Sequence, residues 1–184
     1  VHSTSLYEVC FDNYLNAVKG LSDLIISGIN PHGYCSLVVD VSNPLKNPVE
    51  GPTAQERLEL TTKAFETYGN QFVIDDQEVK RGGVSYTIDT VLSLRKNVSA
   101  ENLYLIIGAD NFELFNKWKD FKNILTEANL IVTTRPGYDL PASIEELPEY
   151  LKDLVEEYDF NMIELKTGRS IQFITLRDVE VSST

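Results

Sequence analysis

Residues suited to binding an anion follow several hydrophobic segments of this 184-residue sequence. These loops contain hydroxyls, amides, a carboxylate and cations, namely Ser42, Asn43 and Lys46; Gly108, Asp110 and Asn111; Thr133, Thr134 and Arg135; and Ser182, Ser183 and Thr184. Backbone amides, hydroxyls and cations of this kind bind phosphate. Lys80 and Arg81 are further candidates for the same anion site. No nucleophile with an attached base accompanies them. The pattern favours a site that aligns phosphates and neutralises charge, although each loop alone could consist of ordinary turn residues.

The elements that must position these loops alternate along the chain. Capping-box pairs are Thr53 with Glu56 and Ser143 with Glu146. Apolar spacing of three and four predicts helices over 5–19, from Thr53 to about 69, from Ser85 or Thr87 to 94, over 111–115 and 119–128, and from Ser143 to about 158. Short apolar runs predict strands over 36–41, 72–74, 103–107, 130–133, 162–165, 171–176 and 179–181.

The fold class predicted from this order is α/β, a doubly wound, Rossmann-like parallel sheet. Strands that alternate with helices, and that are continuously apolar, are typical of parallel sheets covered on both faces. Ligands of such sheets bind outside the carboxyl ends of the strands, where the loops above begin. We expect one domain over residues 1–184, truncated at both ends, because the sequence starts without Met and stops directly after a strand-like segment.

Composition narrows the class of partner. The formal net charge is −12 and the pI is about 4.5, which is the wrong sign for a nucleic-acid-binding surface. The apolar runs are too short for a membrane span. Cys10 and Cys35 have no metal-type spacing, so reduced thiols and a cytoplasmic location are expected, with a single disulfide left open. The sequence does not determine the oligomeric state, and a homo-oligomer is compatible with it.

The combined motifs resemble the bacterial nicotinate mononucleotide adenylyltransferase family, within the nucleotidyltransferase superfamily. The resemblance extends over residues 36–184 and rests on Ser85-Tyr86-Thr87, on Ile107-Gly108-Ala109-Asp110, on Trp118, and on Arg135-Pro136-Gly137. Val181 to Thr184 is similar to the start of the family's closing ISSTxxR motif. Ser5 stands where the family's opening GxFxPxHxGH motif has its second histidine, and His2 stands where it has the first.

The resemblance implies transfer of AMP from ATP to nicotinate mononucleotide, with Mg²⁺ accompanying the ATP. It assigns His2 to the catalytic contact with an ATP phosphate, and Gly108, Asp110, Ser182, Ser183 and Thr184 to ATP binding. It assigns Asn43, Lys46, Tyr86, Thr87, Trp118 and Arg135 to the mononucleotide. Asp110 would accept hydrogen bonds from a ribose, Tyr86 and Thr87 would meet the pyridine carboxylate, and Trp118 would stack on the pyridine ring. No resident protein metal site is implied.

Structural roles compete with several of these assignments. Asp110 and Thr87 could each serve only as a helix cap. Trp118 could be a core residue, Lys46 a solvated surface lysine and His2 a terminal residue without a partner. Two other functions remain open. One is a nucleotide-binding protein of the same fold with impaired catalysis, which the Ser5 substitution motivates, and the other is an adenylyltransferase for another phosphorylated metabolite, such as phosphopantetheine.

Overall fold

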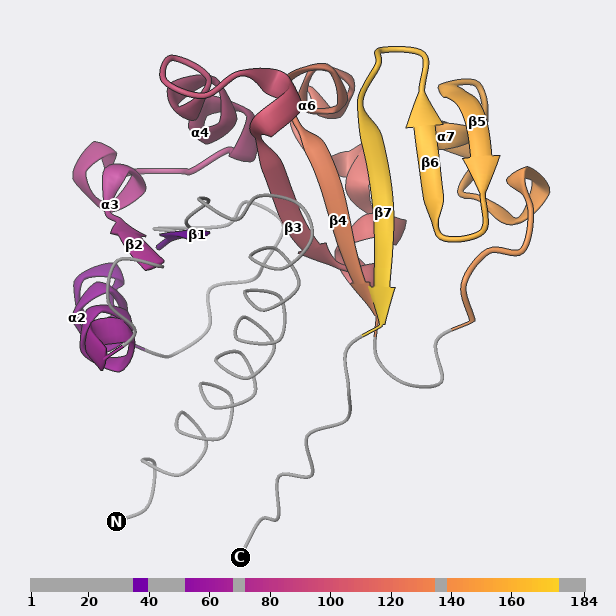
Figure 1. Ribbon diagram of the computed structural model, residues 1–184. Coiled ribbons are helices and arrows are strands. Elements are labelled where there is room, and N and C mark those ends of the chain that lie inside the picture. The colour runs from indigo at the N-terminus through magenta and orange to yellow at the C-terminus, as the bar shows by residue number, and fades with distance from the viewer. Residues whose placement is uncertain (1–34, 40–51, 68–71, 135–138, 176–184) are drawn as a thin grey trace, which may run out of the picture. The chain divides into compact units, whose positions relative to one another are not determined.

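A computed structural model describes residues 35–39, 52–67, 72–134 and 139–175 of the chain (Figure 1). The elements, in chain order, are β1 (Cys35–Val38), α2 (Ala54–Phe65), β2 (Phe72–Asp75), α3 (Gln77–Arg81), α4 (Thr87–Leu94), η3 (Ala100–Asn102), β3 (Tyr104–Gly108), α5 (Ala109–Glu113), η4 (Phe115–Lys117), α6 (Phe121–Glu127), β4 (Asn129–Thr134), η5 (Ile144–Glu146), α7 (Glu149–Lys152), β5 (Val155–Asp159), β6 (Met162–Leu165) and β7 (Ser170–Thr175). Strands alternate with helices as far as β4, which confirms the predicted α/β, Rossmann-like class.

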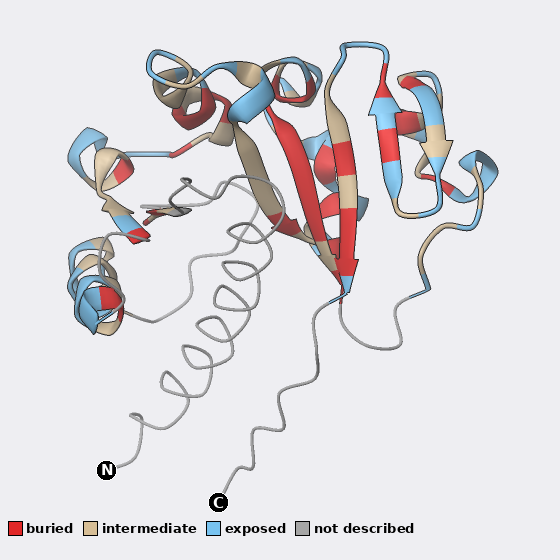
Figure 2. Ribbon diagram, viewed as in Figure 1, coloured by how far each residue is buried: buried red, intermediate tan, exposed pale blue. Residues whose placement is uncertain are grey.

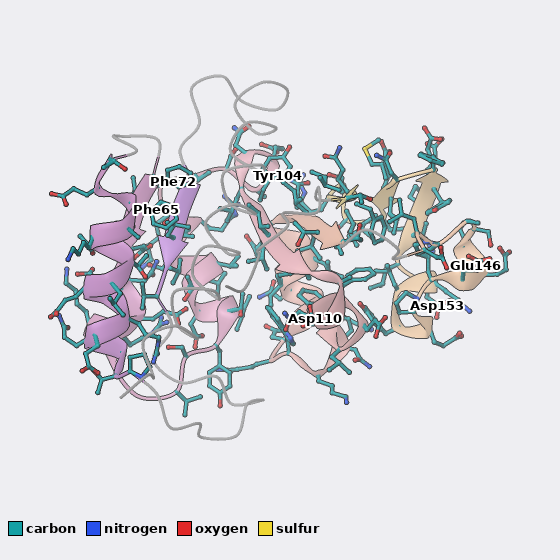
Figure 3. All side chains as sticks on the ribbon, turned by 90° about the horizontal axis from the view of Figure 1, so that it is seen from below. Phe65, Phe72, Tyr104, Asp110, Glu146 and Asp153 are labelled. Carbon is teal, nitrogen blue, oxygen red and sulfur yellow. The ribbon has the colours of Figure 1, made fainter. Side chains whose placement is uncertain are left out.

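The described residues form two compact units. Residues 35–39, 52–67 and 72–82 belong to unit 1, and residues 83–134 and 139–175 belong to unit 2. In unit 1, β1 and β2 pair in parallel, and the ring centroids of Phe65 on α2 and Phe72 on β2 lie 4.9 Å apart (Figure 3). These two rings and Leu37 form a small apolar core. The single domain expected over residues 1–184 stays a prediction.

Unit 2 is built on a five-stranded sheet of order β3-β4-β7-β6-β5. β4 pairs in parallel with β3 and with β7, so the carboxyl ends of these three strands meet at one edge of the sheet. Leu130, Ile131 and Val132 on β4 are each 0% exposed (Figure 2). Because successive side chains of a strand point to opposite faces, both faces of the sheet are covered here, as the continuous apolar run predicts.

The sheet is mixed, whereas a parallel sheet is expected from the sequence. β6 is antiparallel to both β5 and β7. The predicted helix from Ser143 to about 158 is wrong, because this stretch forms η5, α7 and then β5. Pro148, which has no N–H to donate, precedes α7 and separates it from η5. The Glu146 carboxylate accepts from the backbone N–H of Ala142, 2.8 Å away, so the second capping box is also wrong.

Other elements differ from the predictions mainly at their ends. α2 begins at the predicted capping box but ends at Phe65, and α3 was not predicted. The predicted helix over 111–115 is the pair α5 and η4. The predicted helix over 5–19 and the predicted strand over 179–181 lie outside the described residues. None of the helices in the described ranges has the length and apolar character to cross a membrane.

One buried polar side chain ties the strands of unit 2 together. Asn129 at the start of β4 is 5% exposed, and its amide nitrogen donates to the carbonyl oxygens of Ala100 and Glu101, each 3.1 Å away. Its side-chain oxygen accepts from the backbone N–H of Ser170, 2.9 Å away. Because the buried amide is satisfied on both sides, it links η3 to the first residue of β7 and helps to fix the register of the sheet.

Candidate functional site

The carboxyl end of β3 presents an exposed carboxylate beside a glycine. Gly108 ends β3, and Asp110 lies in the first turn of α5, at the sheet edge that Figure 3 views from below. A Cβ on Gly108 would lie 2.6 Å from Oδ1 of Asp110, so only glycine leaves this carboxylate in place. Asp110 is exposed and makes no hydrogen bond or ion pair with any residue in the described ranges. The carboxylate is therefore free to accept hydrogen bonds from a ligand.

Asp110 is not the cap of α5. The residue at the N-cap position is Gly108, and no side-chain hydrogen bond closes the start of this helix. The alternative in which Asp110 serves only as a helix cap is therefore wrong.

Two threonines expected in the loop after β4 belong to the strand itself. Thr133 pairs with Gly108, and its hydroxyl donates to the carbonyl oxygen of Ile107, 3.3 Å away. Thr134 is 1% exposed, and its hydroxyl is bonded to the Thr175 hydroxyl on β7 at 3.0 Å. Both hydroxyls have partners within the sheet. They stabilise the edge that presents Asp110, and they are not free donors for phosphate.

The start of α4 has no side-chain cap. Tyr86 occupies the N-cap position with extended backbone, and Thr87 is the first helical residue, so neither Ser85 nor Thr87 caps the helix as predicted. Ser85 is 8% exposed, and its hydroxyl has no hydrogen-bond partner in the part of the chain that the structure describes. The positive end of the helix dipole and the uncapped N–H groups favour an anion at this position.

Trp118 lies on the core of unit 2 and is still partly exposed. Its ring centroid is 5.0 Å from that of Phe115, which is 0% exposed. It packs against the main apolar cluster without belonging to its buried members. The core role considered for Trp118 is thus partly correct. The exposed part of the indole remains available for stacking on a ligand.

Lys119, the residue after Trp118, contacts the start of α4, and we refer to these two residues as the Trp118–Lys119 segment. Its Nζ lies 4.2 Å from the centroid of the Tyr86 ring and 3.7 Å from Oδ2 of Asp89, in the first turn of α4. Asp120 follows with a φ of 53°, a left-handed conformation that aspartate tolerates, and turns the chain into α6. The structure therefore brings the predicted residues Tyr86 and Thr87 next to the segment that contains Trp118.

An ion pair between the carboxyl ends of α4 and α6 holds this arrangement. Nε of Arg95, directly after α4, lies 2.8 Å from Oε2 of Glu127, the last residue of α6, and both side chains are 26% exposed. A half-buried, hydrogen-bonded pair of this kind is stronger than an exposed one. By holding α4 against α6, it positions the start of α4 relative to the Trp118–Lys119 segment.

Sequence reasoning missed Lys119 as a site residue. The sequence signal was its place beside the lone tryptophan, but nothing in the sequence shows which of Lys117 and Lys119 contacts Tyr86. Lys80 and Arg81, considered for the same anion site, form ion pairs with Asp76 at the N-cap of α3, at 3.0 Å, and with Glu78 in α3, at 3.9 Å.

Several predicted site residues lie outside the described residues. These are His2, Asn43, Lys46, Arg135, Ser182, Ser183 and Thr184. The described site residues are Gly108 and Asp110 at the carboxyl edge of the sheet, and Tyr86, Thr87 and Trp118 around the start of α4. The carboxyl edge of a parallel sheet and the start of a helix are the places where α/β proteins bind nucleotides and their phosphates.

Comparison with known proteins gives a family that agrees with this class. Residues 36–184 match the model of the family described as cytidylyltransferase-like. The chain is 36% identical over 141 residues to a probable nicotinate-nucleotide adenylyltransferase of Aquifex aeolicus, covering 77% of this chain and 76% of the relative. Proteins of the same name from Trichlorobacter lovleyi and Methylococcus capsulatus are 28% and 33% identical, covering 80% and 74% of this chain and 70% and 63% of the relatives.

The fold and these similarities define a nucleotidyltransferase enzyme. The chain belongs to the cytidylyltransferase-like family and, within it, to the family of nicotinate-nucleotide adenylyltransferases. The family predicted from the sequence motifs is confirmed.

Proposed function

We propose that the protein transfers AMP from ATP to nicotinate mononucleotide, giving deamido-NAD and pyrophosphate in NAD biosynthesis. A phosphate oxygen of the mononucleotide attacks the α-phosphorus of ATP, the bond from that phosphorus to the bridging oxygen of the β-phosphate breaks, and pyrophosphate leaves. The observation that carries the proposal is the contact between the start of α4 and the Trp118–Lys119 segment. It puts a helix start suited to an anion beside aromatic rings suited to a pyridine.

Each described residue has a role in this proposal that its surroundings support. Asp110 accepts hydrogen bonds from the ribose hydroxyls of ATP, because its carboxylate is exposed and has no partner in the described ranges. Gly108 keeps that carboxylate in place. Thr87 and the backbone amide at Tyr86 meet the pyridine carboxylate, and the partly exposed Trp118 stacks on the pyridine ring.

The remaining roles belong to residues outside the described ranges. Asn43, Lys46 and Arg135 hold the mononucleotide phosphate, and Ser182, Ser183 and Thr184 hold ATP phosphates. His2 donates to an ATP phosphate and stabilises the charge that develops in the transition state. The reaction takes place in the cytoplasm, in keeping with two cysteines that lack the spacing of a disulfide framework.

Mg²⁺ fits the proposal as a companion of ATP. The described residues contain no group of three or more His, Cys, Asp or Glu side chains that could hold a metal ion. Mg²⁺ is commonly bound by substrate phosphates and water with few protein ligands. When bound, it neutralises charge on the phosphates.

The test is dinucleotide formation by the full-length protein, measured by mass spectrometry with ATP, Mg²⁺ and nicotinate mononucleotide. We expect a product with the mass of deamido-NAD and release of pyrophosphate. Asp110→Ala should lower kcat/KM about 100-fold, since a hydrogen bond to a charged group contributes about 1.5–3 kcal/mol and a ribose offers two hydroxyls. Glu113→Ala removes another exposed carboxylate of α5 and is the matched control.

Three results would contradict the proposal in different ways. Binding of ATP and the mononucleotide without turnover would indicate a protein with impaired catalysis. Turnover only with phosphopantetheine would indicate another acceptor. Equal activity of Asp110→Ala and Glu113→Ala would remove Asp110 from the ATP site.

A further inference from the structure

The Lys119 ammonium is held at the start of α4 and still reaches solvent. Its Nζ lies 4.2 Å from the Tyr86 ring centroid and 3.7 Å from one carboxylate oxygen of Asp89. The Lys119 side chain is 51% exposed and that of Asp89 is 41% exposed. An ammonium has three donors, and one ion pair at this distance leaves capacity for a further anion. The Lys119 ammonium is therefore held in position and can still donate hydrogen bonds to a ligand.

Stability alone is a weak reason for this arrangement. Exposed ion pairs contribute about 0–1 kcal/mol, and a cation over an aromatic ring at an exposed site contributes about 0.5–1 kcal/mol. A lysine side chain loses rotamer entropy when it is held in one geometry, which offsets part of this gain. The same contacts do fix a positive charge over the ring of Tyr86, the residue at the N-cap of α4.

Two independent features at the same helix start also favour an anion. No side chain caps α4; of its first three N–H groups, that of Asp89 donates to the Tyr86 carbonyl oxygen at 3.0 Å, and those of Thr87 and Ile88 have no acceptor in the described ranges. The buried Ser85 hydroxyl, directly before Tyr86, has no hydrogen-bond partner within the described ranges. The uncapped helix start and the held ammonium thus lie side by side in unit 2, and the Ser85 hydroxyl belongs to the residue before the N-cap. Asp89 offsets part of the charge of the ammonium, and in a chain with a net charge of −12 the positive end of the helix and the remaining charge favour an anionic ligand group.

We propose that Lys119 sets the preference of this enzyme for the acid form of the mononucleotide over the amide form. This inference rests on the proposed function and assigns the acid specificity to a particular side chain. Nicotinate and nicotinamide mononucleotide have nearly the same shape and differ in the charge of one substituent. The Lys119 ammonium attracts a carboxylate more strongly than a neutral carboxamide, and the difference in binding free energy becomes the specificity.

The test compares Lys119→Met with the full-length wild-type protein on both mononucleotides. We measure kcat/KM for each, and affinity from the fluorescence of Trp118, the sole tryptophan. Loss of the ammonium should lower kcat/KM and affinity for the acid about 10-fold and leave the amide within about twofold, as expected for one charged hydrogen bond. Lys119→Arg, which keeps the charge, should retain most of the preference.

Lys152→Met is the matched control. Lys152 is also ion-paired, with Glu149 at 2.8 Å, and lies on α7, next to β5 and β6 and away from α4 in unit 2 (Figure 1). The two variants change the net charge equally. We expect Lys152→Met to leave the ratio of acid to amide unchanged.

Each outcome decides between the inference and its alternatives. An equal fall in kcat/KM for both mononucleotides in Lys119→Met would show a structural role, and unchanged kcat/KM for both would show no role; either result overturns the inference while the proposed function stands. A wild-type protein that binds the acid better but forms no dinucleotide would overturn the proposed function, and loss of that binding preference in Lys119→Met would still support the inference. Binding of neither mononucleotide by the wild-type protein would overturn both.

Discussion

The starts of α2 and α4 show two uses of the same kind of position. Both helices follow a residue with extended backbone and have an acidic residue three positions further on. At α2, the Glu56 carboxylate accepts from the Thr53 backbone N–H at 2.7 Å, and the Thr53 hydroxyl accepts from the Glu56 N–H at 3.2 Å. At α4, Asp89 pairs outward with Lys119 and no side chain caps the helix.

The difference separates a helix start that stabilises the fold from one that is available to a ligand. In α2 the chain satisfies its own N–H groups, which is worth about 1 kcal/mol of stability. The start of α4 lacks this capping stabilisation, and its backbone N–H donors lie beside the Lys119 ammonium. Substitution of the threonine at each helix start should therefore affect different quantities.

Of the changes at these two helix starts, the largest effect is expected from Thr87→Val, which removes the hydroxyl at the start of α4 and nearly keeps the volume of the side chain. We predict that kcat/KM for nicotinate mononucleotide falls about 10-fold, because a hydrogen bond to the substrate carboxylate is lost. The free energy of unfolding should change by less than about 0.5 kcal/mol, since Thr87 caps nothing. Steady-state kinetics and denaturant unfolding measure the two quantities. Unchanged kinetics with a large loss of stability would make this helix start structural after all.

Thr53→Ala is the reciprocal change, at the start of α2. We predict that the free energy of unfolding falls by about 1 kcal/mol, because the capping hydroxyl of Thr53 is lost. The kinetic constants should stay within about twofold of wild type, because Thr53 has no proposed contact with substrate. The loss of a substrate hydrogen bond would change them more than this. Unfolding followed by circular dichroism measures the first quantity. A 10-fold loss of kcat/KM without a change in stability would refute the distinction between the two helix starts.

The smallest effect concerns pH. Hydrogen bonds from the backbone and side chain of Thr53 hold the pKa of Glu56 below its usual value of 4.5. The ionised carboxylate therefore stabilises the folded protein above the unfolded pKa, and this contribution is lost as the pH falls through the lower folded value. The stability difference between wild type and Glu56→Gln should shrink on acidification over this range. Unfolding midpoints between pH 7 and pH 3 test this, and a difference that grows with acid would contradict it.

The parallel strands were predictable from the sequence, and the hairpin of β5 and β6 was not. Leu130 to Val132 form a continuous apolar run, which is typical of a strand buried on both faces. Leu151, Val155 and Tyr158 have the spacing of a helix face, so the sequence predicts a helix there. Pairing with β6 makes this segment a strand, with a register shift between Val155 and Glu157. Tertiary pairing overrides a local period when the segment is short.

The candidate site divides in the same way. The place of Gly108 and Asp110 at the end of β3 could be predicted, because a carboxylate two residues after a glycine that ends a strand is a local pattern. Lys119 could not, because its contact with Tyr86 depends on how α4 and α6 pack. The Thr133 and Thr134 hydroxyls looked like free donors in the sequence, and only the neighbouring strands show that the sheet uses them.

By itself the sequence determined the class of fold, the family and the capping box of α2, because periodicity, motif spacing and capping depend on neighbouring residues. The tertiary structure alone decided the antiparallel edge of the sheet and the place of the Lys119 ammonium. It also showed which polar groups near the start of α4 have no partner in the described ranges. The physical reason is that these features depend on contacts between segments distant in the chain, and such contacts form only when the apolar faces of α4, α6 and the sheet are buried together.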